Sequence, residues 1–136
     1  MQEDNYILIK MHRINSTIDR KTAHIAAQYG LTLGQFGVLE ALYHAGDLTV
    51  GEVKEKILST DGTIPVVVRN LVKCDLIRQR KDENDGRRHI LSLTDKGREV
   101  IAKAYPENAV MIEQEMQVWN EEEKQTLVRL FKKFAR

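Results

Sequence analysis

At 136 residues, of which 42% are hydrophobic and 30% charged, the chain has the size and composition of one globular domain, which excludes a disordered or low-complexity protein. No apolar run approaches the roughly 18 residues of a membrane-spanning helix, and the acidic start of MQEDNYILIKMHR does not resemble a signal peptide. We therefore expect a cytoplasmic protein without membrane contact, and its single cysteine, Cys74, cannot form an internal disulfide framework.

The net charge of +1 conceals an uneven distribution of charge along the chain. From Arg69 to Arg98 there are nine basic and five acidic residues, whereas the segment from Glu107 to Glu123 has six glutamates and no lysine or arginine. The first region can therefore bind an anion, whereas the second would repel it. This asymmetry predicts a polyanionic partner that contacts only the middle of the chain.

Residues 4–29 have the pattern of a long amphipathic helix that ends at Gly30. Its apolar residues recur at steps of three, four and seven and form a heptad-like seam. Thr22 occupies the one position of this repeat that has no apolar residue. The seam consists of Ile7, Met11, Ile14, Ile18, Ile25 and Tyr29. Such a stripe can pack against a second subunit or against the C-terminal helices of its own chain, and the pattern does not choose between the two.

Three shorter helices are expected next. Thr32 can cap the first, which stops near Gly46, and Thr49 can cap the second. The third is expected over Thr63–Lys73, where Pro65 lies in the first turn and its missing N–H costs little. The apolar residues that this third helix offers to the core are Val67, Val68, Leu71 and Val72.

The hydrophobic period then changes from that of a helix to that of a strand. Residues 76–80 and 89–94 are expected to form a two-stranded hairpin around the turn-forming stretch ENDG. Thr94 can cap the following helix, which runs toward Trp119 with a kink or break at Pro106. The last helix carries apolar residues at helical spacing, namely Leu127, Leu130, Phe131 and Phe134.

Three short helices followed by a hairpin are the order of a winged helix-turn-helix, so the predicted fold is mainly α with a small β-hairpin wing. In that fold the third helix reads the major groove of DNA. Its N-terminal N–H groups can bind phosphate, while Arg69 can grip guanine, Asn70 adenine, and Val66 the methyl group of thymine. The candidate DNA-binding residues in and before this helix are Asp61, Gly62, Thr63, Val66, Arg69, Asn70 and Lys73.

The wing supplies a second set of candidates. An arginine at the tip of a hairpin can enter a narrow minor groove, where the negative potential of DNA is strongest. Asp85 is expected to hold the guanidinium of Arg87 by a charge-assisted hydrogen bond. Arg87 is then the side chain expected to enter the minor groove. Arg88 would contact phosphate or pack on the wing. The alternative is a charged hairpin that is simply solvated.

The wing and its surroundings resemble the MarR (multiple antibiotic resistance regulator) family. That family has Asp-x-Arg, a short apolar strand and then Leu-Thr-x-x-Gly, and the matching residues here are Asp85, Arg87, Leu91, Leu93, Thr94 and Gly97. LTLGQFGVLEAL resembles the second helix of the family, and NLVKCDLIRQRKDENDGR its recognition helix and the start of its wing. Two positions depart from the pattern: Asp75 replaces a glycine, and Pro65 a small hydroxyl residue.

The resemblance implies one MarR-like domain, in which residues 31–99 bind double-stranded DNA and residues 1–30 and 100–136 are dimerisation helices. It implies a homodimeric, ligand-responsive repressor that acts on a pseudo-palindromic operator and needs no cofactor. A small aromatic or phenolic effector would bind where the first helix meets the second and the fifth. Met11, Phe36 and Tyr43 are the candidates there, with core packing as their alternative role.

Other functions stay open at this point. The chain could be a winged-helix module that docks another protein without binding DNA. It could respond to zinc or to oxidants, although His12 and His24 are twelve residues apart, unlike metal ligands on one helix face, and Cys74 is expected to be a partly buried structural thiol. An enzyme is disfavoured, because the sequence has no metal-ligand motif, phosphate loop or Ser/His/Asp order.

Overall fold

The structure, a computed structural model, describes residues 1–57 and 64–134. In these ranges the chain has long helices at both ends and a winged helix between them, which confirms the fold class expected from the sequence. The elements in chain order are α1 (Gln2–Ala27), α2 (Leu33–Ala45), β1 (Leu48–Thr49), α3 (Val50–Lys56), α4 (Ile64–Lys73), β2 (Ile77–Lys81), β3 (His89–Leu93), α5 (Asp95–Met116) and α6 (Glu121–Phe131).

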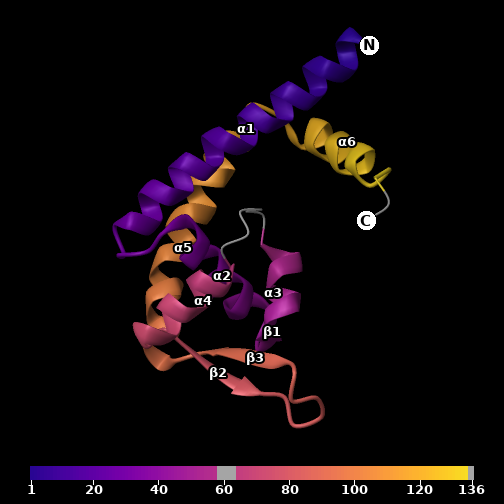
Figure 1. The fold of residues 1–136 in the computed structure, drawn as a ribbon. Helices are drawn as coiled ribbons and strands as arrows, with labels where there is room; N and C mark the ends of the chain where they lie inside the picture. The colour runs from indigo at the N-terminus through magenta and orange to yellow at the C-terminus, as the bar shows by residue number, and fades with distance from the viewer. Residues whose placement is uncertain (58–63, 135–136) are drawn as a thin grey trace.

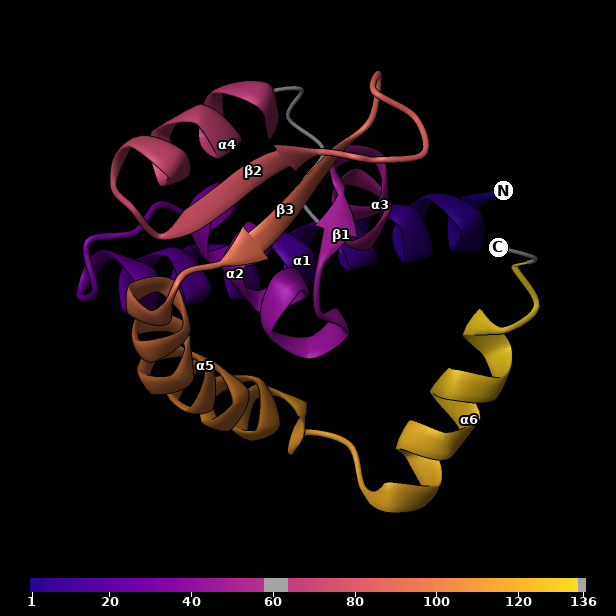
Figure 2. The same cartoon turned by 90° about the horizontal axis from the view of Figure 1, so that it is seen from below.

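α1 and α5 run side by side and support the winged helix. Figure 1 shows α1 above the body formed by α2, α3, α4 and the strands, and α5 running from α1 down beside this body to the end of β3. The hydroxyl of Thr22 on α1 donates a 2.8 Å hydrogen bond to Oδ1 of Asn108 on α5, and both side chains are buried. Lys21 forms an ion pair with Glu115 on the same two helices. Figure 2 shows α6 standing apart from this body, with both chain termini on its side of the molecule.

The buried core lies where α2, α4, α5 and the sheet meet. Its largest fully buried side chains include Leu39, Leu42, Leu71, Ile77, Leu91 and Ile101. Each of these elements therefore contributes apolar surface to one cluster, and burial of that surface fixes the positions of α4 and the wing relative to α5. No residue of α6 is buried in the single chain.

Local capping chemistry sets the starts of the helices, as expected. The hydroxyl of Thr32 accepts a hydrogen bond from the backbone of Gln35, whose side chain accepts one in return, and Thr49 forms the same capping box with Glu52. Thr94 caps α5 by accepting from the N–H of Gly97. At the ends of α1 and α2, the chain turns at glycines with positive φ, Gly30 and Gly46.

The sheet has one more strand than the expected hairpin. β1, only two residues long, pairs with β3 in the order β1-β3-β2, with Leu48 opposite Leu91 and Thr49 opposite Ile90. A two-residue strand has no detectable alternation, so its partner is chosen by tertiary packing. The hairpin itself is confirmed, with Ile77 opposite Leu93 and Lys81 opposite His89.

Two sequence expectations about the burial of single residues were wrong. Val72 is 39% exposed, because the inward face of α4 is formed by Ile64, Val68 and Leu71, and Val72 lies at the edge of that face, about 70° from its centre. Cys74 is exposed, since it lies just beyond the end of α4, before the chain turns at Asp75. α5 continues through Pro106, so the break that was one of the two expectations for this proline is absent; the proline is exposed, where water can bind the carbonyl that loses its partner.

The end of α4, the end of β3 and the start of α5 are joined at one point. Asp75 leaves α4 with φ at 61°, the left-handed conformation that glycine adopts most easily, and the N–H of Leu76 bonds back to Leu71 at 2.9 Å. The Leu76 carbonyl accepts from the N–H of Thr94 at 3.1 Å, and the Thr94 hydroxyl donates to the Asp75 carbonyl at 2.7 Å. Gly97 packs so closely here that an added Cβ would lie 1.9 Å from the Leu76 oxygen.

This joint predicts a strict requirement for glycine at position 97. Gly97→Ala would force the first turn of α5 away from Leu76, and we expect it to lower the free energy of unfolding by about 3 kcal/mol or more. The matched control is Gly86→Ala, whose added Cβ meets nothing within 4 Å. Urea denaturation of both variants checks this, and equal stability of the two would contradict the proposed role of the close approach.

Candidate nucleic-acid interface

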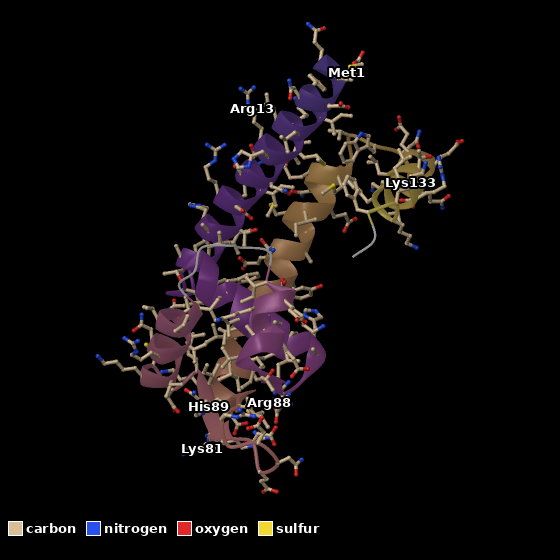
Figure 3. All side chains as sticks on the ribbon, turned by 45° about the vertical axis from the view of Figure 1, so that its right-hand side comes forward. Met1, Arg13, Lys81, Arg88, His89 and Lys133 are labelled. Atoms are coloured by element: carbon tan, nitrogen blue, oxygen red, sulfur yellow. The ribbon has the colours of Figure 1, made fainter. Side chains whose placement is uncertain are left out.

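α4 and the loop between β2 and β3 project on the same side of the molecule, while α5 and α6 lie on the other side (Figure 2). The wing residues Lys81, Arg88 and His89 are at the end opposite Met1 and Lys133 (Figure 3). The basic middle of the chain and its acidic C-terminal part are therefore separated in space as well as in sequence.

The solvent face of α4 carries the expected side chains. Val66, Arg69, Asn70 and Lys73 are all exposed and lie at helical spacing on the face opposite the buried stripe. Their mixture of a guanidinium, an amide, an ammonium and an apolar group is suited to the edges of base pairs and to phosphates. The three expected residues at the helix start, Asp61, Gly62 and Thr63, lie outside the described residues.

Backbone hydrogen bonds close the tip of the wing. The N–H of Asp82 donates to the carbonyl of Arg88 at 2.9 Å, and the N–H of Arg88 donates to the carbonyl of Asp85 at 3.0 Å. The Asp82 carboxylate also accepts from the N–H of Asn84 at 3.0 Å. The loop is thus tied at several points and presents its side chains from a defined backbone.

The Asp85–Arg87 contact expected from the sequence is present. One oxygen of Asp85 accepts hydrogen bonds from the backbone N–H of Arg87 at 3.1 Å and from its Nε at 3.2 Å. These two bonds, the backbone one foremost, hold the pKa of Asp85 below its usual value. Because the Arg87 side chain is still 93% exposed, its terminal nitrogens remain available to a ligand while its Nε is held.

Two further arginines have structural contacts on the wing. Arg88, half exposed, lies 3.8 Å from the Asp82 carboxylate. Arg80 donates to the hydroxyl of Ser92 at 2.8 Å and to the carboxylate of Asp47 at 3.4 Å, which connects the wing to the turn before β1. No local sequence pattern predicts these contacts of Arg80, because its two partners are 12 and 33 residues away.

A cavity of about 500 Å³ lies between α1, α2 and α5, where an effector pocket was expected. Of the three candidates, Phe36 lines it and Met11 and Tyr43 do not. Met11 is two helical turns before Ile18, the first α1 residue in the wall, and the ring of Tyr43 packs toward Tyr105, at 6.3 Å between centroids. The polar residues in the wall that the sequence analysis missed include Glu40, His44 and Asn108.

Within residues 1–57 and 64–134, no three His, Cys, Asp or Glu side chains come together as ligands of a metal ion would. Over the same residues, no helix combines the length and the apolar character needed to cross a membrane.

Comparison with known proteins identifies the family. Residues 20–104 match the family model described as transcriptional regulator SarA/Rot. The HTH-type transcriptional regulator MhqR of Bacillus subtilis (strain 168) is 31% identical over 115 residues, which cover 85% of this chain and 79% of that protein.

Solved structures share the fold. A mutant MarR from E. coli, in complex with operator DNA, superposes with a TM-score of 0.83 at 24% identity, covering 98% of this chain and 96% of the other. NadR in complex with 4-hydroxyphenylacetate superposes with a TM-score of 0.79 at 21% identity, covering 96% and 92%. The chain therefore belongs to the SarA/Rot group of the MarR family and is a DNA-binding transcriptional regulator of the winged helix-turn-helix class.

Proposed function

We propose that the protein is a homodimeric, ligand-responsive repressor that binds a pseudo-palindromic site in duplex DNA, and hence acts in the cytoplasm. In this proposal residues 31–99 read the DNA, and residues 1–30 and 100–136 join the two copies. The observation that carries it is the exposed Arg87, which Asp85 holds in the β2–β3 loop, and that loop projects on the same side of the molecule as α4 (Figure 2).

The two parts of the interface have different roles. α4 enters the major groove, where Arg69 and Asn70 hydrogen-bond to base edges and Val66 contacts a thymine methyl. Lys73 and Arg88 neutralise phosphates, and Asp61, Gly62 and Thr63 are assigned to phosphate at the helix start. Arg87 enters the adjacent minor groove. It loses less side-chain entropy on binding than a free arginine would, because Asp85 already restrains its guanidinium.

Exposed apolar surface supports the dimer. Large apolar side chains remain exposed on two helices at the end away from the wing, namely Tyr6, Ile7, Leu8 and Ile9 on α1 and Val128, Leu130 and Phe131 on α6, with Phe134 beyond it. Phe131 is 52% exposed and Phe134 74%, which is unusual for so large an apolar group unless a partner covers it. A second copy would bury these residues and place two α4 helices about 34–36 Å apart, one turn of DNA.

The cavity beside Phe36 supports regulation by a small aromatic molecule. It lies where the supporting helices α1 and α5 meet α2, which packs against α4. A ligand there can favour a spacing of the two α4 helices that no longer fits successive major grooves, so that DNA affinity falls by a shift of population.

Selection of bound fragments from a random duplex pool tests the proposal directly. We expect an inverted repeat with half-sites about one helical turn apart, and affinity that falls steeply with salt because counterions are released from the phosphates. Enrichment of no sequence, with weak binding that is insensitive to salt, would favour a winged-helix module that docks another protein.

Arg87→Ala is expected to weaken binding to the selected DNA roughly 5- to 100-fold, or about 1–3 kcal/mol, and to reduce the salt dependence by about one released ion. Dimerisation should be unchanged. Asp85→Asn, which leaves Arg87 in place, should weaken binding less and leave the salt dependence intact. Fluorescence anisotropy at several salt concentrations measures both effects.

The matched control is Arg20→Ala, which removes the same charge from the exposed surface of α1 far from the wing. Should Arg87→Ala bind as tightly as Arg20→Ala does, the role given to the wing is wrong.

Phe131→Glu is expected to convert the dimer into monomers at micromolar concentration, because it places a charge in the middle of the apolar face of α6. Gln125→Glu is the control, since it adds the same charge on the opposite side of that helix. Sedimentation velocity distinguishes the two. Equal behaviour of the variants would remove α6 from the dimer interface.

A further inference from the structure

Arg80 connects the two edges of the three-stranded sheet. Its Nη1 donates to the hydroxyl of Ser92 on β3 at 2.8 Å and to the carboxylate of Asp47, in the turn before β1, at 3.4 Å. Because β3 is the middle strand, this side chain reaches from β2 across β3 to the turn beside the far edge. It adds a side-chain contact at the edge where the backbone pairs β1 with β3 through only two residue pairs.

The turn at Asp47 belongs to the helical part of the winged helix. It connects α2 to β1, and β1 continues directly into α3. α2 in turn packs against α4. A side chain of the wing that holds the Asp47 turn therefore also holds the wing relative to the helix that is assigned to the major groove.

The hairpin is held more firmly near α4 and α5 than toward its tip. At the near end, Ile77 on β2 and Leu91 on β3 are fully buried in the core. Farther along β2, the chain is exposed from Arg78 to Lys81. In this exposed part of β2, and among the residues that the structure describes, Arg80 is the side chain bonded to a segment outside the hairpin.

The contact of Arg80 with Asp47 contributes little to the stability of the fold. The two side chains are 56% and 54% exposed, and water screens an ion pair in such a position. Arg78 lies two residues earlier on the same face of β2 and is also exposed, but it has no side-chain hydrogen bond or ion pair within the described ranges. The two arginines share a charge and a face and differ in their contacts.

The tip of the wing follows the strands that carry it. The N–H of Asp82 donates to the carbonyl of Arg88, the N–H of Arg88 donates to the carbonyl of Asp85, and Asp85 holds Nε of Arg87. Since the loop is tied within itself, the direction of the two strands decides where Arg87 lies relative to α4.

We propose that Arg80 is a positioning residue for DNA binding: by holding Ser92 and Asp47, it fixes the angle of the wing and hence the separation between the base pairs contacted by α4 and the minor groove entered by Arg87. The proposal rests on the DNA contacts assigned above to α4 and Arg87, and it adds what sets the distance between them. The alternative is a direct contact of Arg80 with phosphate, which predicts a different result for Asp47→Asn.

Double-mutant cycles on the selected DNA separate positioning from charge. Arg80→Gln and Asp47→Asn both break the contact, but only the first removes a positive charge from the wing. We expect both variants to weaken binding and to make the loss caused by Arg87→Ala about threefold or more smaller than in the wild-type protein, because a displaced Arg87 contributes less. The control Arg78→Gln should leave the loss caused by Arg87→Ala unaltered.

The angle of the wing can also be measured without DNA. Nitroxide labels at Glu55→Cys on α3 and at Gly86→Cys in the tip, in a Cys74→Ser chain diluted with unlabelled protein, report the distance between the helices and the tip by double electron–electron resonance. An added side chain at Gly86 meets nothing within 4 Å. We expect the distance distribution to shift or broaden with Arg80→Gln and with Asp47→Asn, and to stay unchanged with Arg78→Gln.

Three results would overturn the proposal. One is a distance distribution that Arg80→Gln leaves unchanged, and another is a pair of losses from Arg80→Gln and Arg87→Ala that simply multiply. The third is an Asp47→Asn variant that binds DNA as tightly as the wild-type protein, which would make Arg80 a direct phosphate contact. Altered distances in a protein that selects no DNA would instead refute operator binding and leave Arg80 as the residue that holds the wing.

Discussion

The architecture depends on the joint at which the backbone of Asp75 and Leu76 meets Thr94 and Gly97. Four backbone and side-chain hydrogen bonds and one very close approach bring together the end of α4, the end of the wing and the start of α5. A displacement of α5 would therefore reach α4 and the wing through this joint. The Leu-Thr-x-x-Gly pattern is therefore a requirement of packing rather than of DNA contact.

The basic side chains of the wing and the exposed apolar side chains of α1 and α6 lie at opposite ends of the molecule. At the wing end, backbone hydrogen bonds hold a loop from which Arg87 projects, and Arg80 anchors that loop to the turn before β1. At the other end, apolar side chains of α1 and α6 are exposed beside a glutamate-rich segment. A polyanion is attracted to the first end and repelled from the second, which leaves the second free for association of two copies.

Between these ends, the buried polar pair Thr22–Asn108 occupies a position that an apolar pair could have filled. A satisfied buried hydrogen bond contributes only about 1 kcal/mol, and an apolar pair of similar shape can be nearly neutral in stability. The polar pair in the cavity wall is therefore better explained by recognition of a ligand than by a contribution to the stability of the fold. In this respect the 500 Å³ cavity differs from a packing defect, which is lined by apolar groups alone.

What the sequence by itself determined are the features that depend on neighbours within four residues: the Thr32, Thr49 and Thr94 caps, the turns at glycine and the Asp85–Arg87 contact. Only the tertiary structure decided the pairing of β1, the exposure of Val72, the link from Arg80 to Asp47, and the placement of Glu40 and Asn108 in the wall of one cavity. The physical reason is distance along the chain. The hydrogen bonds of a cap or a turn depend on local geometry. A contact between residues tens of positions apart forms only when burial of the apolar core brings their elements together.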